Sequence, residues 1–170
     1  MAKTTIPTGG LADNAVTIAK ATGFGKVAQV VQNVITSGNT ASSSTSFAAT
    51  SHLVAITPSA TSSNILLSFS FQQGTQTNNR YPLFRIYRDI GGAGYSAVYP
   101  ATDIINVGGT YDNNDIEMSV YHRVPLLFLD SPNTTSAVNY KVYVKNSGGS
   151  NVTISNSNGD STINLFEVSA

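Results

Sequence analysis

Apolar and polar side chains alternate with a period of two along most of the chain from Lys26 onward, and this pattern predicts β-strands. In the segment 64–72 (NILLSFSFQ) one face is wholly apolar and is made of Ile65, Leu67, Phe69 and Phe71. In the segment 137–146 (AVNYKVYVKN) the predicted inward residues are Val138, Tyr140, Val142 and Val144. The alternating, predicted outward residues of that segment are Asn139, Lys141, Tyr143 and Lys145. Such alternation is typical of a sheet with one face in the core and one in water.

Further strands are predicted by the same pattern over residues 26–36, 52–57, 82–90, 95–100, 115–130, 151–155 and 161–169. A turn of Gly91, Gly92, Ala93 and Gly94 is expected to join two of them as a hairpin. Pro125 predicts an edge, a bulge or a break, because proline cannot donate to a strand ladder. The Ser/Thr-rich stretch 40–63 is interpreted as strands with hydroxyl-bearing outer faces. We therefore predict an all-β protein, a jelly-roll-like antiparallel β-sandwich.

Residues 1–25 follow a different pattern, and we expect them to form an N-terminal attachment arm in front of a sandwich domain over 26–170. The segment 11–20 (LADNAVTIAK) is compatible with two helical turns, with Asp13 as N-cap. A helix this short is marginal alone and needs a surface to lie on. We expect Leu11, Val16 and Ile18 to dock the arm on a neighbouring subunit or another protein.

The chain carries few charges, and this changes the picture from fold to function. Charged residues make up 11% of the sequence, and none occurs between Lys26 and Arg80. Nine basic residues balance nine acidic ones, which argues against a surface that binds nucleic acid or an anionic membrane. Hydroxyls and amides lose less free energy than ions when they are desolvated, so such faces suit contacts between subunits. There is no cysteine, and no apolar run typical of a signal peptide or membrane span, so we expect synthesis in a cytoplasm.

Several residue groups are compatible both with a functional site and with an ordinary structural role. His52 and His122 lack a nucleophile-elbow signature and are expected to be surface or half-buried strand residues. Asp112, Asp115 and Glu117 are compatible with a calcium loop or with an acid/base pair for glycoside cleavage, but also with an ordinary Asx-rich turn.

The segment 80–88 (RYPLFRIYR) interleaves basic and aromatic residues, a pattern that can stack bases or sugars. Its ordinary reading is a sandwich strand with Phe84 and Ile86 in the core and Arg85 and Tyr87 outside. No cofactor and no metal ligand set is predicted from these groups.

Several segments resemble small virion structural proteins of tailed bacteriophages, in particular fibre-like and head-decorating proteins of phages of aquatic bacteria. The resemblance lies in the stretches 6–32 (IPTGGLADNAVTIAKATGFGKVAQVVQ), 54–67 (VAITPSATSSNILL), 83–89 (LFRIYRD), 129–149 (LDSPNTTSAVNYKVYVKNSGG) and 162–170 (TINLFEVSA). It implies a jelly-roll-like sandwich that trimerises on a virion surface, on either the capsid or the tail. It implies no catalytic residues.

The leading hypothesis is therefore a non-enzymatic virion structural protein, anchored by its arm and assembled in the host cytoplasm. We expect a homotrimer, with residues 27–79 contributing to subunit contacts and other virion proteins as partners. The alternative is a carbohydrate-binding module at a fibre tip, which binds a host surface glycan through Tyr95, Tyr99 or Tyr111. An enzyme that cleaves capsular polysaccharide through Asp112, Asp115 or Glu117 is a third hypothesis.

Overall fold

The chain is an all-β antiparallel sandwich in the computed structural model, which describes residues 26–36, 40–75, 82–105, 120–147, 152–155 and 160–169. Within these ranges there is no helix, and the strands are β1 (Lys26–Ile35), β2 (Thr40–Ser42), β3 (Ala48–Ile56), β4 (Asn64–Thr75), β5 (Pro82–Ile90), β6 (Ser96–Ile105), β7 (Val120–Asp130), β8 (Val138–Asn146), β9 (Val152–Ser155) and β10 (Ser161–Ser169). The predicted fold class is confirmed. The predicted arm, residues 1–25, lies outside the described residues.

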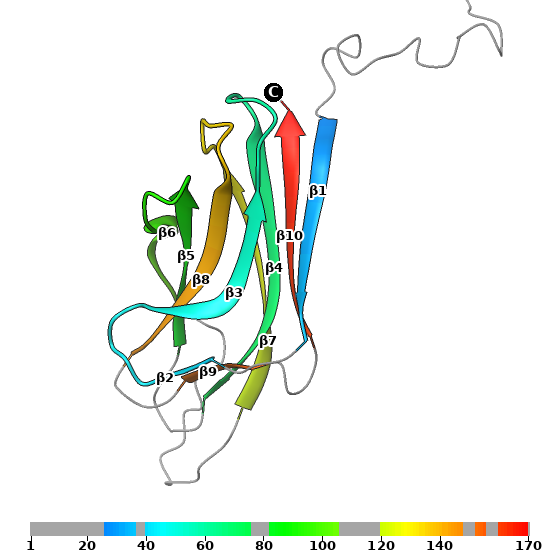
Figure 1. Cartoon of the computed structure of the whole chain (residues 1–170). Helices are drawn as coiled ribbons and strands as arrows, with labels where there is room; N and C mark the ends of the chain where they lie inside the picture. Colours follow the sequence, from blue (N-terminus) through cyan, green and yellow to red (C-terminus); the bar gives the residue numbers. More distant parts are fainter. Residues whose placement is uncertain are drawn as a thin grey trace, which may run out of the picture.

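Two sheets pack face to face (Figure 1). Sheet A contains β1, β10 and β4 in that order, with β7 on the other side of β4 and the short strands β9 and β2 at one end. Sheet B has the order β3-β8-β5-β6. Without the two short strands, the orders β1-β10-β4-β7 and β3-β8-β5-β6 are those of a jelly roll, in which strands distant in sequence pair with each other.

The core lies between the sheets and is built by the alternation seen in the sequence. On β4, Ile65, Leu67, Phe69 and Phe71 are each at most 1% exposed. The facing residues of β8 in sheet B are fully buried and comprise Val138, Tyr140, Val142 and Val144. The aromatic rings of the two sheets meet edge to face, with the Phe71 and Phe84 centroids 4.8 Å apart. Burial of large apolar side chains from both sheets is the main stabilising contribution in such a sandwich.

Two local predictions are confirmed at the sheet edges. β7 pairs with β4 on one side and has no strand on its other side among the described residues, so Pro125 opposite Ser70 lies in an edge strand. Proline is tolerated there because its missing N–H removes no ladder bond from a neighbouring strand. The turn between β5 and β6 contains Gly91 and Gly94 with φ of 61° and 105°, backbone conformations that favour glycine.

The prediction for His52 is wrong. Its side chain is fully buried, at 0% exposure, and its ring centroid lies 6.0 Å from that of Phe71. The cause is the register of β3, which begins at Ala48 and places Thr50, His52 and Val54 on the inward face. Leu53 takes an outward position on the same strand. Burial lowers the pKa of His52 to about 4, because an imidazolium has little solvation there.

An ion pair and a tyrosine join the two sheets. Arg88 of β5 donates from Nη1 to both carboxylate oxygens of Asp130 on β7, at 2.9 and 2.8 Å. The Tyr140 hydroxyl of β8 donates to Asp130 Oδ2 at 2.7 Å. Burial and this bond to Asp130 raise the pKa of Tyr140 well above its usual range. Asp130 therefore links sheet A to two strands of sheet B.

Glu167 of β10 forms a second buried polar centre. Its Oε1 accepts hydrogen bonds from the backbone N–H and the hydroxyl of Ser59, at 2.7 and 2.6 Å, and its Oε2 accepts one from Gln29 at 2.7 Å. Burial alone raises the pKa of this carboxyl, but hydrogen bonds from Ser59 and Gln29 outweigh burial and hold the pKa at about 2. The carboxylate fixes the connection between β3 and β4 to β10 and, through Gln29, to the edge strand β1.

The variant Glu167→Gln is expected to lower the free energy of unfolding by about 2 kcal/mol at neutral pH, because it replaces charge-assisted bonds with weaker ones. Since the folded pKa lies below the ordinary 4.5, this stabilisation is complete above pH 4.5 and is lost as the pH falls toward 2. Urea denaturation of the parent and the variant at several pH values measures this contribution to the free energy of unfolding. Asp160→Asn, at an exposed carboxylate, is the control. Equal acid sensitivity of Glu167→Gln and the parent between pH 4.5 and 2 would contradict the assignment.

Candidate interaction surfaces

Several residues singled out in the sequence lie outside the described residues, and predictions about them stay predictions. They are the arm residues Leu11, Val16 and Ile18, the tyrosine Tyr111, and the acidic residues Asp112, Asp115 and Glu117. Of the three tyrosines expected to contact glycans, Tyr95 and Tyr99 are described. Among the described residues no group of three or more potential metal ligands occurs. No helix in the same part of the chain is long and apolar enough to cross a membrane.

Tyr99, the second tyrosine expected to contact a glycan, lies within strand β6. Its ring stacks on that of Phe128 in β7, with centroids 4.4 Å apart and an interplanar angle of 20°. Both side chains are partly buried against the core. Tyr99 therefore has a structural role, because its ring packs between β6 at the edge of sheet B and β7 at the edge of sheet A.

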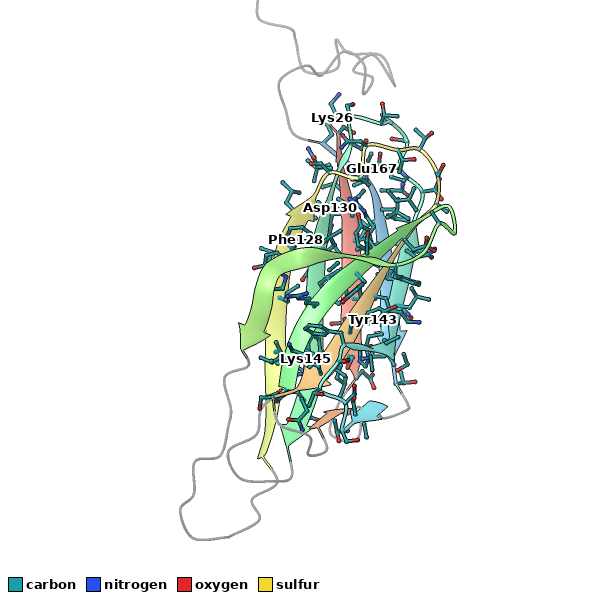
Figure 2. The ribbon with its side chains drawn as sticks, turned by 90° about the vertical axis from the view of Figure 1, so that its left-hand side faces the viewer. Lys26, Phe128, Asp130, Tyr143, Lys145 and Glu167 are labelled. Carbon is teal, nitrogen blue, oxygen red and sulfur yellow. The ribbon has the colours of Figure 1, made fainter. Side chains whose placement is uncertain are left out.

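Tyr95 belongs to a group of aromatic and basic side chains on the outer face of sheet B, here called the aromatic-basic surface. Its members are Phe47, Arg85, Tyr87, Tyr95, Lys141, Tyr143 and Lys145. The antiparallel register of β5 and β8 pairs Arg85 with Tyr143 and Tyr87 with Lys141. Figure 2 shows Tyr143 and Lys145 on β8, in a view from the sheet B side.

The four rings of this surface form a continuous row. Tyr87 and Tyr143 stack at its centre, with centroids 3.9 Å apart and an interplanar angle of 27°. Phe47 lies 6.3 Å from Tyr87 at one end, and Tyr95 lies 6.0 Å from Tyr143 at the other. Each ring is partly exposed. The sequence placed Arg85, Tyr87, Lys141, Tyr143 and Lys145 outside the core, and this is confirmed, but it did not bring them together.

Cations lie over the two ends of the row. The Arg85 guanidinium is 4.8 Å and the Lys145 ammonium 4.9 Å from the Phe47 centroid. The Lys141 ammonium is 5.5 Å from the Tyr95 centroid. The pKa of Tyr95 is raised mainly by burial and to a smaller extent by the nearby Asp89 carboxylate. Burial also raises the pKa of Tyr143. Both phenols therefore remain protonated hydrogen-bond donors at neutral pH.

A second surface lies on the outer face of sheet A. The cross-strand register aligns Val30, Phe166, Leu66 and Leu129 in one row across β1, β10, β4 and β7. Leu127 lies beside this row on β7, and the five residues are here called the apolar band. Val30, Leu127 and Leu129 are 57%, 65% and 54% exposed. Large apolar side chains exposed together on one face are less common in monomeric proteins than single exposed ones.

The positions around the apolar band are uncharged. The neighbouring outward side chains are Gln32, Val34, Asn64, Ser68, Ser70, Pro125, Thr162 and Asn164. Gln32 and Asn164 bond to each other at 2.7 Å. Arg123 lies at one end of the face, where it donates to the Asp160 carbonyl at 3.0 Å. A sequence signal for this band exists, because apolar residues occupy both faces at Ile65-Leu66-Leu67 and Leu165-Phe166.

Comparison of the sequence with protein-family models gives no match, and comparison with curated proteins gives none either. Comparison with solved structures gives a match to a chain described as "Structure of infectious bursal disease virus Gt strain". The sequence identity is 16% and the TM-score 0.35, over 85% of this chain and 39% of that chain. The match thus spans less than half of the length of the viral chain.

Proposed function

We propose that this chain is a non-enzymatic structural subunit of a virion, which assembles with further copies of itself through the apolar band. The observation that supports the proposal is the row of Val30, Phe166, Leu66 and Leu129 on a face that carries almost no charge. Covering such a row removes apolar area from water, and this stabilises the contact by about 25 cal/mol per Å² of buried area. The neighbouring hydroxyls and amides can be desolvated at far lower cost than ions.

A second copy of the chain is the occupant that suits this face. Another copy can cover the face without burying an unpaired charge, because Arg123 lies at the end of the face and is bonded within its own chain. The homotrimer expected from the sequence is the specific assembly we propose. The resemblance to phage virion proteins supports a virion location, on the capsid or in a fibre, and supports residues 1–25 as the attachment device.

The double variant Leu127→Ser/Leu129→Ser is expected to convert the oligomer into a folded monomer, because it removes the two most exposed leucines of the apolar band. Light scattering coupled to gel filtration at micromolar concentration measures the mass. Leu53→Ser, at a partly exposed leucine on the outer face of sheet B, is the matched control and should leave the oligomer intact. The parent oligomer should also persist between low salt and about 1 M salt, where charge pairs are screened. A monomeric parent chain, or dissociation by salt alone, would contradict this interface.

Deletion of residues 1–25 tests the virion role separately. The described sandwich begins at Lys26, so the shortened chain is expected to fold with the same thermal stability. Its incorporation into particles is expected to be lost, because the attachment device is gone. Quantitative mass spectrometry of purified particles, with the full-length chain as control, measures the copy number. Normal incorporation of the shortened chain would move the attachment function to the sandwich.

Carbohydrate binding is the second candidate function. It is favoured by one observation, the position of Tyr95 in a row of four partly exposed rings. Aromatic faces that remain accessible to solvent are suited to the apolar CH faces of sugar rings.

A further inference from the structure

The exposed apolar side chains of sheet A are concentrated at its two edges. Among the described residues, the large hydrophobic side chains that are most exposed all lie on β1 or β7, the strands at the two edges of this sheet. They are Val27, Val30 and Val34 on β1, here called the valine edge, and Leu127 and Leu129 on β7, here called the leucine edge. The members of the apolar band between the edges, Phe166 and Leu66, are partly buried. Each copy of the chain therefore presents two separate apolar edges.

Both edge strands are held against sheet B by their inward side chains. Gln29 and Asn33 of β1 donate from their side-chain amides to the backbone carbonyls of Thr57 and Leu53, at 2.6 and 2.7 Å. At the other edge, Phe128 of β7 stacks on an aromatic ring of β6. The exposed valines and leucines do not belong to the core cluster between the sheets. The edges are therefore fixed in position by contacts in which these side chains take no part.

We propose that copies of the chain associate head to tail, with the leucine edge of one sheet A against the valine edge of the next. The inference rests on the proposed self-assembly and specifies its contact. Head-to-tail contacts use two different surfaces of each copy and close into a ring where the rotation allows it. In such a ring both apolar edges of every copy are covered. A two-fold contact between two like edges would leave the other edge of each copy exposed to water.

The strand register matches the two edges residue by residue. Val30 lies in the cross-strand row that ends at Leu129, and Val34 lies in the row that ends at Pro125. Rotation about an axis parallel to the strands leaves the height of each row unchanged. Leu129 of one copy therefore meets Val30 of the next, and Pro125 meets Val34. Because Pro125 lacks the N–H that a continuous ladder between the copies would need, the contact is made by side chains.

The charges near the two edges do not oppose this contact. Lys26 lies at the start of β1, whereas Arg123 lies toward the opposite end of sheet A. Copies at equal height therefore place neither cation against the other. The outward positions of both edges between these cations are uncharged. Gln32, which lies at the height of Leu127, already donates from its amide to Asn164 at 2.7 Å.

Engineered disulfides in the full-length chain test the pairing, because the chain contains no cysteine of its own. The double variant Val30→Cys/Leu129→Cys places one thiol on each edge. Within one copy the two positions are separated by β10 and β4, and three strand spacings amount to about 14 Å. A disulfide needs Cα atoms within about 7 Å, so the bond can form only between copies. After mild oxidation, non-reducing gels are expected to show most of the chain in covalent species larger than a dimer, up to the size of the native oligomer.

Three control variants show whether the bond depends on the proposed pairing. Val30→Cys alone and Leu129→Cys alone should give no covalent dimer, because neither position meets itself in a head-to-tail contact. The matched control Leu129→Cys/Leu53→Cys carries its second thiol on the outer face of sheet B and should also remain without an interchain bond. A covalent dimer from either single variant would overturn the proposal and indicate a contact between two like edges.

The size of the product and the state of the parent chain separate the remaining outcomes. A double variant whose crosslinking stops at the covalent dimer would overturn the ring and indicate a two-fold contact between whole faces of sheet A. Light scattering of the parent chain reports self-assembly independently of the disulfide. A monomeric parent would contradict the proposed function and the pairing with it, whereas an oligomeric parent whose double variant forms no interchain disulfide would overturn the pairing alone.

Discussion

Replacement of Arg88 by alanine is expected to lower the free energy of unfolding by about 3–5 kcal/mol. The guanidinium supplies two of the three hydrogen bonds that the Asp130 carboxylate accepts in the structure, and Tyr140 supplies the third. The Asp130 side chain is only 8% exposed, so its charge would stay buried with a single neutral donor. The loss is that of an uncompensated buried charge, which exceeds the net contribution of the ion pair itself. Urea denaturation at neutral pH measures the difference.

Two further variants separate this explanation from a simple loss of packing. Arg88→Met combined with Asp130→Leu and Tyr140→Phe removes all the polar partners together and is expected to recover most of the stability. Arg123→Ala removes an exposed arginine on β7 and should change stability by less than about 1 kcal/mol. An Arg88→Ala variant within 1 kcal/mol of the parent, at roughly the level of a surface pair, would show that Asp130 is not the link between the sheets.

Acidification is expected to destabilise the sandwich through His52. The folded pKa is about 4 and the ordinary value 6.5, so below pH 6.5 the unfolded chain binds a proton that the folded chain excludes. The contribution of neutral His52 is therefore complete above pH 6.5 and declines as the pH falls to 4. Over this window the free energy of unfolding is expected to fall by about 3 kcal/mol, since one pKa unit corresponds to about 1.4 kcal/mol.

The variant His52→Leu isolates this effect, because leucine has a similar volume and no titratable group. Its free energy of unfolding should change little between pH 6.5 and 4, and it should exceed that of the parent at pH 4.5. Denaturant titrations across this range, combined with an NMR titration of the His52 ring signals, provide the measurement. A His52 ring that titrates near pH 6.5 in the folded protein would contradict the assignment. The Glu167 contribution is distinct, since it is lost at lower pH.

The sandwich could be predicted from the sequence because one face of each long strand is buried. The predicted strand 82–90 coincides with β5, and the inward residues of β4 and β8 were identified by their alternation. The polarity of the individual residues does not predict which face of β3 is buried, because Thr50 and His52 are buried there and Leu53 points outward. The ladder to β8 is irregular between Ala49 and Leu53, and the continued alternation along β3 places Thr50 and His52 inward against the preference of their side chains.

The candidate surfaces depend on pairings that alternation does not specify. β5 and β8 are separated along the chain by β6 and β7, yet their pairing brings Tyr87 next to Lys141 and Arg85 next to Tyr143. The row of the apolar band likewise requires the order β1-β10-β4-β7. The outward residues of β5 and β8 could be assigned from the sequence, but those of the apolar band could not, because apolar residues occupy both faces there. Which outer residues become neighbours follows from the jelly-roll order, and that order is set by the packing of the whole domain.

The pairing of β1 with β10 also has a consequence for the timing of folding. Gln29 and Glu167 bond directly although they are 138 positions apart, and Figure 1 shows the two strands side by side. During synthesis β1 leaves the ribosome long before β10 exists, and β10 is the strand with which it pairs in sheet A. Contacts of such high sequence separation slow folding and leave apolar segments exposed in the meantime. We therefore expect Val30, Val31 and Ile35 to lack their partner strand until β10 emerges, so the unfinished polypeptide should be more prone to aggregation than the complete chain.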